Sequence, residues 1–206
     1  YEVYSKSQGE NDYNDDINAR SLMTNYLSGG SVFNPTEKGL KVPFELTFAM
    51  HSDAGFKTDD ALVGSLGIYT TNFNDGKVNC GISRYASRDL TDMVLTGLQK
   101  DISSRFGIQW ARRSMWNRNY SETRLPAVPS MILETLSHQN FADLKLGYEP
   151  EFKFTVARSV YKSILKYLAE MHHCNYTVQP LPVSHFAVTE GKKKNTFELR
   201  WIPTED

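Results

Sequence analysis

The stretch Val128-Pro-Ser-Met-Ile-Leu-Glu-Thr135 is a compact apolar run that ends at a carboxylate, Glu134. An apolar run of this length is typical of a strand that is buried on both faces of a sheet. The earlier stretch Pro43-Phe-Glu-Leu-Thr-Phe-Ala-Met50 has large apolar side chains at alternate positions, and His51-Ser-Asp-Ala-Gly55 follows it. Open α/β sheets place their ligands at the carboxyl ends of central strands, so both strand ends are candidate sites.

The rest of the chain adds helices and strands to these two segments, because apolar residues recur there at helical spacing or at alternate positions. Helices are predicted over residues 15–27, 87–106 and 151–171, and further strands over residues 1–5 and 64–70. Since helices and strands alternate, we predict an α/β fold of three layers, with a mostly parallel or mixed sheet flanked by helices. The predicted α/β domain spans residues 1–175, and residues 176–206 form a separate short β segment.

Composition and charge limit the functions to consider. The chain has 206 residues, of which 40% are hydrophobic and 23% charged, so we expect one ordinary globular domain. A net charge of −1 predicts no strong attraction to nucleic acid or to an anionic membrane surface. No apolar run reaches the ~18 residues of a membrane-spanning helix, and the first residues lack the pattern of a signal peptide. Two distant cysteines predict neither a zinc ribbon nor a defined disulfide.

The residues that end the two apolar strands are the candidates for catalysis. A neutral imidazole at His51 could bind zinc, although a histidine at a strand end is more often a hydrogen-bonded structural residue. A carboxylate at Glu134 is costly to bury unless it is paired or functional. A raised pKa would suit Glu134 as a general base, and the alternative is that Glu134 caps the following helix.

The middle of the chain mixes arginines with aromatic residues. This surface could bind sugar rings or a peptide carboxylate, whereas single-stranded nucleic acid is disfavoured by the net charge. The alternative is a set of salt bridges and packed side chains. The residues concerned are Arg84, Arg88, Arg112, Arg113, Arg118 and Arg124, interleaved with Tyr85, Trp110, Trp116 and Tyr120. We find no serine-hydrolase elbow, phosphate-binding glycine loop or His-Glu-x-x-His motif.

Two motifs together resemble the zinc-dependent N-acetylmuramoyl-L-alanine amidases of the amidase 3 type. Phe48-Ala-Met-His-Ser-Asp-Ala54 is similar to the family's Ser-Ile-His-Ala-Asn, and residues 128–144 are similar to its Pro-x-Val-Leu-Val-Glu-x-Gly-Phe-x-Ser-Asn segment. Arg20 and Thr24-Asn25 resemble the arginine and the alanine-asparagine pair that the family places earlier. The resemblance covers residues 1–172 and ends with the helix from Glu151.

The resemblance implies a zinc-dependent amide hydrolase that acts on peptidoglycan or a related cell-envelope glycopeptide, in the periplasm or outside the cell. His51 would be the last of three zinc ligands, and Glu134 would be the catalytic carboxylate. We also expect Asp53, Arg84, Arg113 and Asn140 to contact the substrate. The family's first two ligands, a histidine in Gly-His-Gly and a glutamate, have no counterpart here. We therefore expect a fragment of the intact domain rather than a metal-free relative.

Three further segments of the sequence resemble a large secreted group of Bacteroidetes proteins that often carry the label xanthan lyase. The matching segments are residues 83–90, 113–122 and 136–143. The label implies eliminative cleavage of a polysaccharide, whereas the zinc-amidase pattern implies hydrolysis. A third alternative is a non-catalytic module of the same fold that binds carbohydrate or cell wall. The final segment, residues 180–201, resembles the opening strands of a fibronectin type III domain.

Overall fold

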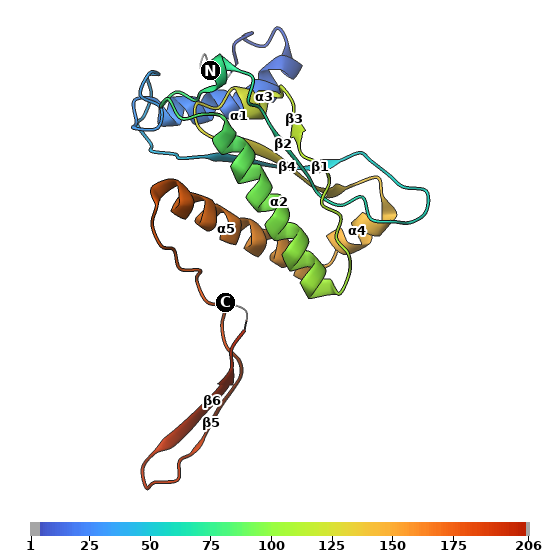
Figure 1. Ribbon diagram of the computed structural model, residues 1–206, viewed down its shortest axis with the longest axis vertical. Helices are drawn as coiled ribbons and strands as arrows, with labels where there is room; N and C mark the ends of the chain where they lie inside the picture. The colour runs from blue at the N-terminus through green and yellow to red at the C-terminus, as the bar shows by residue number, and fades with distance from the viewer. Residues whose placement is uncertain (1–4, 205–206) are drawn as a thin grey trace. The chain divides into compact units, whose positions relative to one another are not determined.

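The computed structural model of the protein describes residues 5–204, so the strand predicted over residues 1–5 lies, apart from Ser5, outside the described residues. Figure 1 shows the elements in place. They are α1 (Asp12–Ser28), β1 (Thr47–Asp53), β2 (Leu66–Tyr69), the short 3-10 helix η1 (Asn74–Gly76), α2 (Tyr85–Phe106), β3 (Trp116–Asn117), α3 (Ser121–Arg124), β4 (Ser130–Ser137), α4 (Phe141–Gly147), α5 (Pro150–His172), β5 (Ser184–Glu190) and β6 (Phe197–Ile202).

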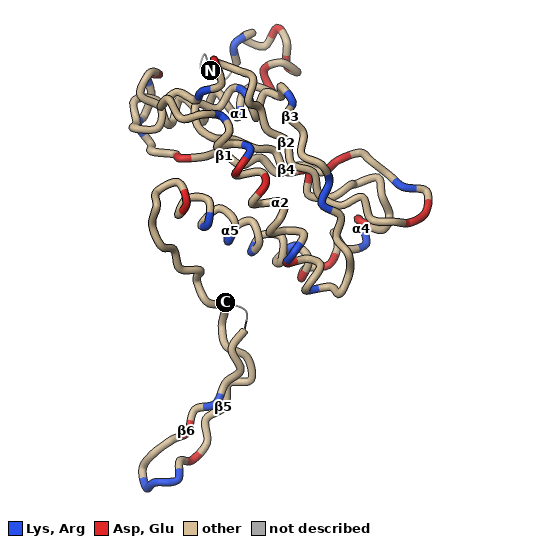
Figure 2. Tube along the Cα trace, viewed as in Figure 1, with Lys and Arg blue, Asp and Glu red and all other residues tan. Residues whose placement is uncertain are grey.

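The chain forms two compact units, Tyr1–Tyr167 and Leu168–Asp206. The second unit contains an antiparallel hairpin in which Val188 of β5 lies opposite Leu199 of β6. A lysine-rich turn, residues 192–195, joins these strands at the tip of the hairpin (Figure 2). An isolated two-stranded hairpin is marginally stable at best, so this unit has little core of its own. The domain boundary after residue 175 and the resemblance to fibronectin type III stay predictions.

The first unit is built on a four-stranded sheet with the strand order β1-β4-β2-β3. β1 and β4 are parallel, β2 runs antiparallel to β4, and β3 runs parallel to β2, so the sheet is mixed as predicted. In the register of β1 with β4, His51 lies directly opposite Glu134. Glu134 in turn lies opposite Leu66 of β2. Residues directly opposite one another point to the same face, which we call the site face.

Helices cover both faces of this sheet. On the site face, the Ser130 hydroxyl donates to the carbonyl of Thr123 in α3 (3.0 Å), and α1 packs on α3. On the other face, a Cβ added at Gly67 would lie only 2.3 Å from Thr91 of α2. The α2 and α5 helices also approach closely, because a Cβ at Gly97 would lie 2.5 Å from the Ser163 hydroxyl. The three-layer α/β fold that the sequence predicts is thereby confirmed.

The core follows from the apolar runs of the sequence. Trp110 and Phe152 of α5 are the largest fully buried side chains, and α2 and β4 supply many of the others, each of which contributes about 1.5–3 kcal/mol by leaving water. They include Leu90, Leu95, Leu98, Ile102, Met131 and Leu133. On the site face, a smaller cluster of Leu66, Ile68 and Ile132 packs against Ala49. Both strands that carry the candidate catalytic residues therefore stand on a packed core.

Some element bounds differ from those predicted. The strand predicted over residues 43–50 is wrong at both ends: β1 begins at Thr47 and continues to Asp53, because its pairing with β4 extends beyond His51. The first helix begins three residues earlier than predicted, at Asp12, because the side chain of Asn11 caps it by accepting from the N–H of Asn14. α3, α4 and β3 were not predicted at all.

Within residues 5–204, no helix combines the length and the hydropathy needed to cross a bilayer. Cys80 and Cys174 are free thiols.

Candidate active site

The centre of the candidate site is the pair of His51 and Glu134 on adjacent strands. Their backbones are opposite in the β1–β4 register, and neighbouring strands lie about 4.8 Å apart. Both side chains point to the site face. Two separate sequence motifs, one that ends in histidine and one that ends in glutamate, thus meet at one place in the fold.

Glu134 is held in an environment that favours its protonated form. Its Oε2 atom is buried and has no hydrogen-bond partner among the described residues. Burial raises the pKa of Glu134 above its ordinary value, and the negative charge of Asp53 raises it further, whereas His51 and Arg113 oppose the shift. A carboxyl group whose pKa is raised accepts a proton more readily than an ordinary glutamate and can release it again, as a general acid–base requires.

Glu122 is part of the site, although the sequence did not identify it. It lies in the four-residue helix α3, and its Oε2 accepts a hydrogen bond from His51 Nε2 at 2.7 Å. Its other oxygen, Oε1, accepts from Arg20 Nε of α1 at 2.8 Å. Arg20, Glu122 and His51 therefore form a continuous polar chain that ends beside Glu134. The only hint in the sequence was Arg20, which resembles a family arginine.

A cavity of about 390 Å³ opens beside this chain of side chains. Its volume is in the range of small-molecule sites. The walls combine the polar residues Arg20, His51 and Glu122 with apolar side chains of β1 and a proline. The full lining is Arg20, Ser21, Thr24, Thr47, Phe48, Ala49, Met50, His51, Glu122 and Pro126. The cavity therefore gives access to His51 from the side of α1 and α3.

The described residues do not supply a complete metal site. A catalytic zinc needs about three protein ligands, and residues 5–204 contain no group of three His, Cys, Asp or Glu side chains that could hold a metal ion. His51 Nε2 is occupied by Glu122. The described side chains thus supply one candidate zinc ligand, His51, and not the complete set of about three.

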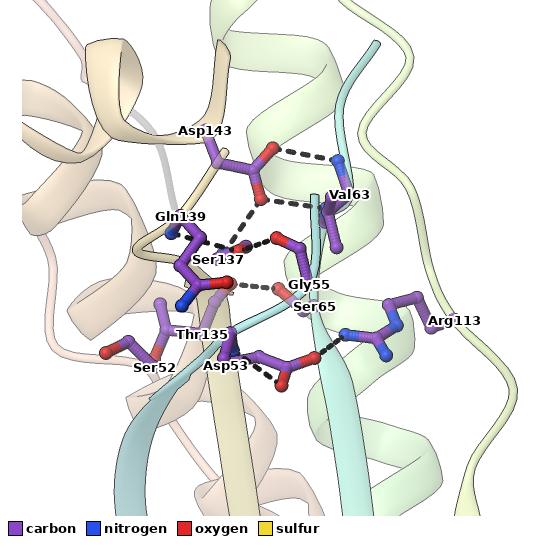
Figure 3. Close-up of polar contacts among 12 residues, drawn as sticks. Ser52, Asp53, Gly55, Val63, Ser65, Arg113, Thr135, Ser137, Gln139 and Asp143 are labelled. Atoms are coloured by element: carbon purple, nitrogen blue, oxygen red, sulfur yellow. Dashed lines mark hydrogen bonds and ion pairs between the residues drawn. The ribbon is translucent and has the colours of Figure 1, made fainter. Parts of the chain in front are cut away.

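Asp53 and Arg113 form an ion pair two residues beyond His51, shown in Figure 3. Burial alone would raise the pKa of Asp53, but hydrogen bonds from Arg113 and from the N–H of Ala54, together with the Arg113 charge, hold that pKa below its usual range. Asp53 therefore stays ionised near Glu134. The Arg113 guanidinium also lies over the ring of Trp116, 5.8 Å from its centroid.

A buried carboxylate fastens the loop after β1 to the end of β4 (Figure 3). Asp143 accepts hydrogen bonds from the N–H groups of Val63 (2.9 Å), Gly64 (3.1 Å) and Ser137 (2.9 Å). Asn140 is buried beside it, where it donates to Ala61 O and accepts from Lys57 N. Asn140, for which we predict a substrate contact, uses its side-chain amide to hold backbone in this structure.

Arg84 is another residue for which we predict a substrate contact, and it lies inside the fold. It is buried, and its guanidinium donates to the backbone carbonyls of Lys77, Thr123 and Arg124. Its donors are therefore used within the fold, where they hold α3 against the start of α2. Of the four expected substrate contacts, Asp53 and Arg113 are near enough to Glu134 to shift its pKa.

Comparison with known proteins identifies the fold of this chain. No protein-family model matches the sequence, and no curated protein matches it either. Among solved structures, the N-acetylmuramoyl-L-alanine amidase of Clostridium difficile 630 is similar, with a TM-score of 0.53 at 13% identity over 81% of this chain and 78% of that chain.

Two further structures agree with this. The CwlD amidase of Clostridioides difficile, solved in complex with the GerS lipoprotein, has a TM-score of 0.53 at 14% identity over 82% of this chain and 71% of its own. Ami1, an N-acetylmuramyl-L-alanine amidase of Mycobacterium smegmatis, has a TM-score of 0.50 at 17% identity over 75% and 61%. The chain thus has the α/β fold found in N-acetylmuramoyl-L-alanine amidases.

Proposed function

We propose that this chain carries the acid–base part of an amide hydrolase that acts on peptidoglycan or a related cell-envelope glycopeptide. The observation that carries the proposal is the juxtaposition of His51 and the unpaired Glu134 oxygen on the site face. A buried carboxylate oxygen without a partner is costly unless it has a function. The amidase names of the proteins with this fold support the same reaction class.

The residues present define a simple sequence of proton transfers. Glu134 takes a proton from the attacking water as the oxygen bonds to the amide carbon. When the carbon–nitrogen bond breaks, Glu134 returns that proton to the leaving amine. Glu122, itself held by Arg20, fixes the orientation of the His51 ring beside the reacting group. These steps produce one carboxylic acid and one amine and leave the enzyme unchanged.

Zinc belongs to the proposal as a ligand of His51. When bound, zinc polarises the amide carbonyl and lowers the pKa of its water. Because residues 5–204 supply too few ligands, the others would come from outside these residues. Zinc content by atomic emission, measured for the wild type and for His51→Ala, tests this part; equal metal content in both would remove His51 as a ligand.

The location follows from the substrate. Peptidoglycan lies outside the cytoplasmic membrane, so we propose a periplasmic or extracellular protein. Fractionation of cells that express the intact protein, followed by immunoblotting, tests this location. Recovery from the cytoplasm alone would contradict it.

The reaction class can be read from products. Purified muropeptides are incubated with the protein and the products analysed by mass spectrometry. The proposal expects a free stem peptide with an N-terminal alanine and a disaccharide with a free lactyl carboxylate, which together gain one water. An unsaturated sugar that absorbs in the ultraviolet would indicate elimination instead, as the lyase label implies.

A second candidate function is a non-catalytic module that binds cell wall. It is favoured by the incomplete metal site. Sedimentation with purified peptidoglycan, with and without a chelator, separates the two. Binding that is indifferent to the chelator, with no cleavage products, supports the module.

A further inference from the structure

We propose that Trp116 and Arg113 form a subsite that binds a sugar ring of the substrate next to Glu134. This inference rests on the proposed function and adds to it the part of the substrate that is recognised. It assigns a role to exposed aromatic surface on the site face, which the acid–base steps do not use.

The register of the sheet places Trp116 on the same face as Glu134. Trp116 of β3 lies opposite Ile68 of β2, and Ile68 lies opposite Ile132 of β4. Ile132 and Glu134 are two residues apart in β4, so their side chains share a face. Trp116 is thus separated from Glu134 by two strand spacings, about 10 Å, and by two residues along the strand, about 7 Å. Together these offsets give about 12 Å, so the ring that stacks on Trp116 belongs to a sugar further along the bound glycan than the one at the scissile amide.

Arg113 links the tryptophan to the candidate catalytic carboxylate. Its guanidinium donates to Asp53 at one end and lies over the Trp116 ring at 5.8 Å. Asp53 is close enough to Glu134 to raise the pKa of that group. The backbone of Arg113 is fixed as well, because its N–H donates to the carbonyl of Ser65 (3.0 Å). Arg113 and the Trp116 ring beneath it are therefore held in place before substrate binds.

The Trp116 indole is kept partly in water, unlike a core tryptophan. It is 39% exposed, whereas the Trp110 indole is fully buried and donates to the Ser65 hydroxyl. Tyr120, four residues later, is exposed as well. A sugar ring has an apolar C–H face that can stack on an indole and hydroxyls that can accept from a guanidinium. Pockets that combine aromatic walls with a few fixed polar groups are typical ligand sites.

The charges favour a neutral sugar over an anion or a nucleobase. The positive charge of Arg113 is already balanced by Asp53, so the remaining N–H groups offer hydrogen bonds with little net charge. A peptide carboxylate would have to compete with Asp53 for the same guanidinium. A nucleic acid would have to approach a chain of net charge −1.

The test measures binding without turnover. The probe is the neutral disaccharide N,N′-diacetylchitobiose, which has neither a stem peptide nor a carboxylate, titrated by calorimetry. We expect Trp116→Ala to weaken binding about tenfold or more and Trp116→Phe, which keeps a ring, to weaken it less than about threefold. Phe154→Ala is the matched control, because Phe154 is an exposed aromatic residue of α5, which packs with α2 on the opposite side of the sheet, and it should bind as the wild type does. Circular dichroism checks that each variant is folded.

The inference is overturned if Trp116→Ala and Trp116→Phe both bind the disaccharide as tightly as the wild type. It is also overturned if the free stem peptide, and not the disaccharide, binds in a manner that depends on Trp116. The test of the subsite and the test of the proposed function can fail independently of each other. Loss of cleavage in a Glu134 variant with unchanged disaccharide binding by Trp116→Ala would refute the subsite only. The reverse pattern, full cleavage by the Glu134 variant with weakened binding by Trp116→Ala, would refute the acid–base role of Glu134 only.

Discussion

His51 Nε2 lies 2.7 Å from Glu122 Oε2, although 71 residues separate the two in the chain. A carboxylate oxygen accepts hydrogen bonds, so His51 donates through its Nε2–H in this arrangement. Arg20 donates to the other oxygen of Glu122 at 2.8 Å. The orientation of the histidine is therefore decided by a residue on a four-residue helix.

Removal of this carboxylate should disturb the site more than the fold. In Glu122→Ala, His51 and Arg20 both lose their partner, and we expect a loss of about 1–3 kcal/mol in unfolding free energy. Activity on muropeptides should fall in kcat more than in KM, because the ring of His51 is no longer oriented. Nitrogen-15 NMR of the imidazole reads the tautomer directly. An unchanged Nε2–H signal in Glu122→Ala would contradict the positioning role.

Asp143 should be among the most sensitive residues for stability. It is fully buried and accepts three backbone N–H groups, so Asp143→Ala leaves several buried donors unpaired. We expect a loss of about 3 kcal/mol or more in urea unfolding. Asp16→Asn is the control, because its exposed pair with Arg20 (3.8 Å) contributes little. Equal losses in both variants would show that the loop does not depend on this carboxylate.

Gly64 is required by its backbone conformation and by its neighbour. Its φ is +78°, and an added Cβ would lie 2.0 Å from the Ala111 carbonyl oxygen. Gly81 provides the comparison, since its φ is +87° but nothing lies within 4 Å of an added Cβ. Gly81→Ala should cost about 1–2 kcal/mol in denaturant unfolding, from the left-handed conformation alone. Gly64→Ala should cost clearly more, and a smaller cost at Gly64 would contradict the close packing.

Acid should weaken the start of α1 through Asp15. Hydrogen bonds from the Ser7 side chain and backbone, and from the Ser5 hydroxyl, lower the pKa of Asp15 to about 2. The folded pKa is below the unfolded value of about 3.9, so this stabilisation is complete above that pH and disappears as the pH falls toward the folded value. Thermal unfolding between about pH 5 and pH 2 should therefore depend less on pH in Asp15→Asn than in the wild type. Identical pH dependence in both would contradict this assignment.

The sequence predicted the parts of the fold that repeat a pattern over many residues. α2 and α5 have apolar stripes over several turns, and β4 is a continuous apolar run. β3 and α3 have two and four residues, too few to show a period. The antiparallel direction of β2 was also beyond prediction, because side-chain alternation is the same in both directions.

For the site, the two strand ends could be found because each closes a recognisable motif. Glu122 could not, since its contact with His51 depends on how the chain between β1 and α3 returns to the sheet. Arg84 was expected at the surface, but composition does not distinguish an exposed guanidinium from one whose donors reach buried carbonyls. Asn140 shares this difficulty, because a buried amide and a substrate-binding amide have the same sequence signal.

The most direct test of the account is the rate of muropeptide cleavage by Glu134→Gln. The amide keeps the shape of the side chain but cannot take a proton from water, so kcat should fall about 100-fold or more while KM changes little. Glu10→Gln, a change at an exposed position, serves as the matched control and should cleave at the wild-type rate. Undiminished cleavage by Glu134→Gln would contradict the assignment of Glu134 as the acid–base of a hydrolytic site.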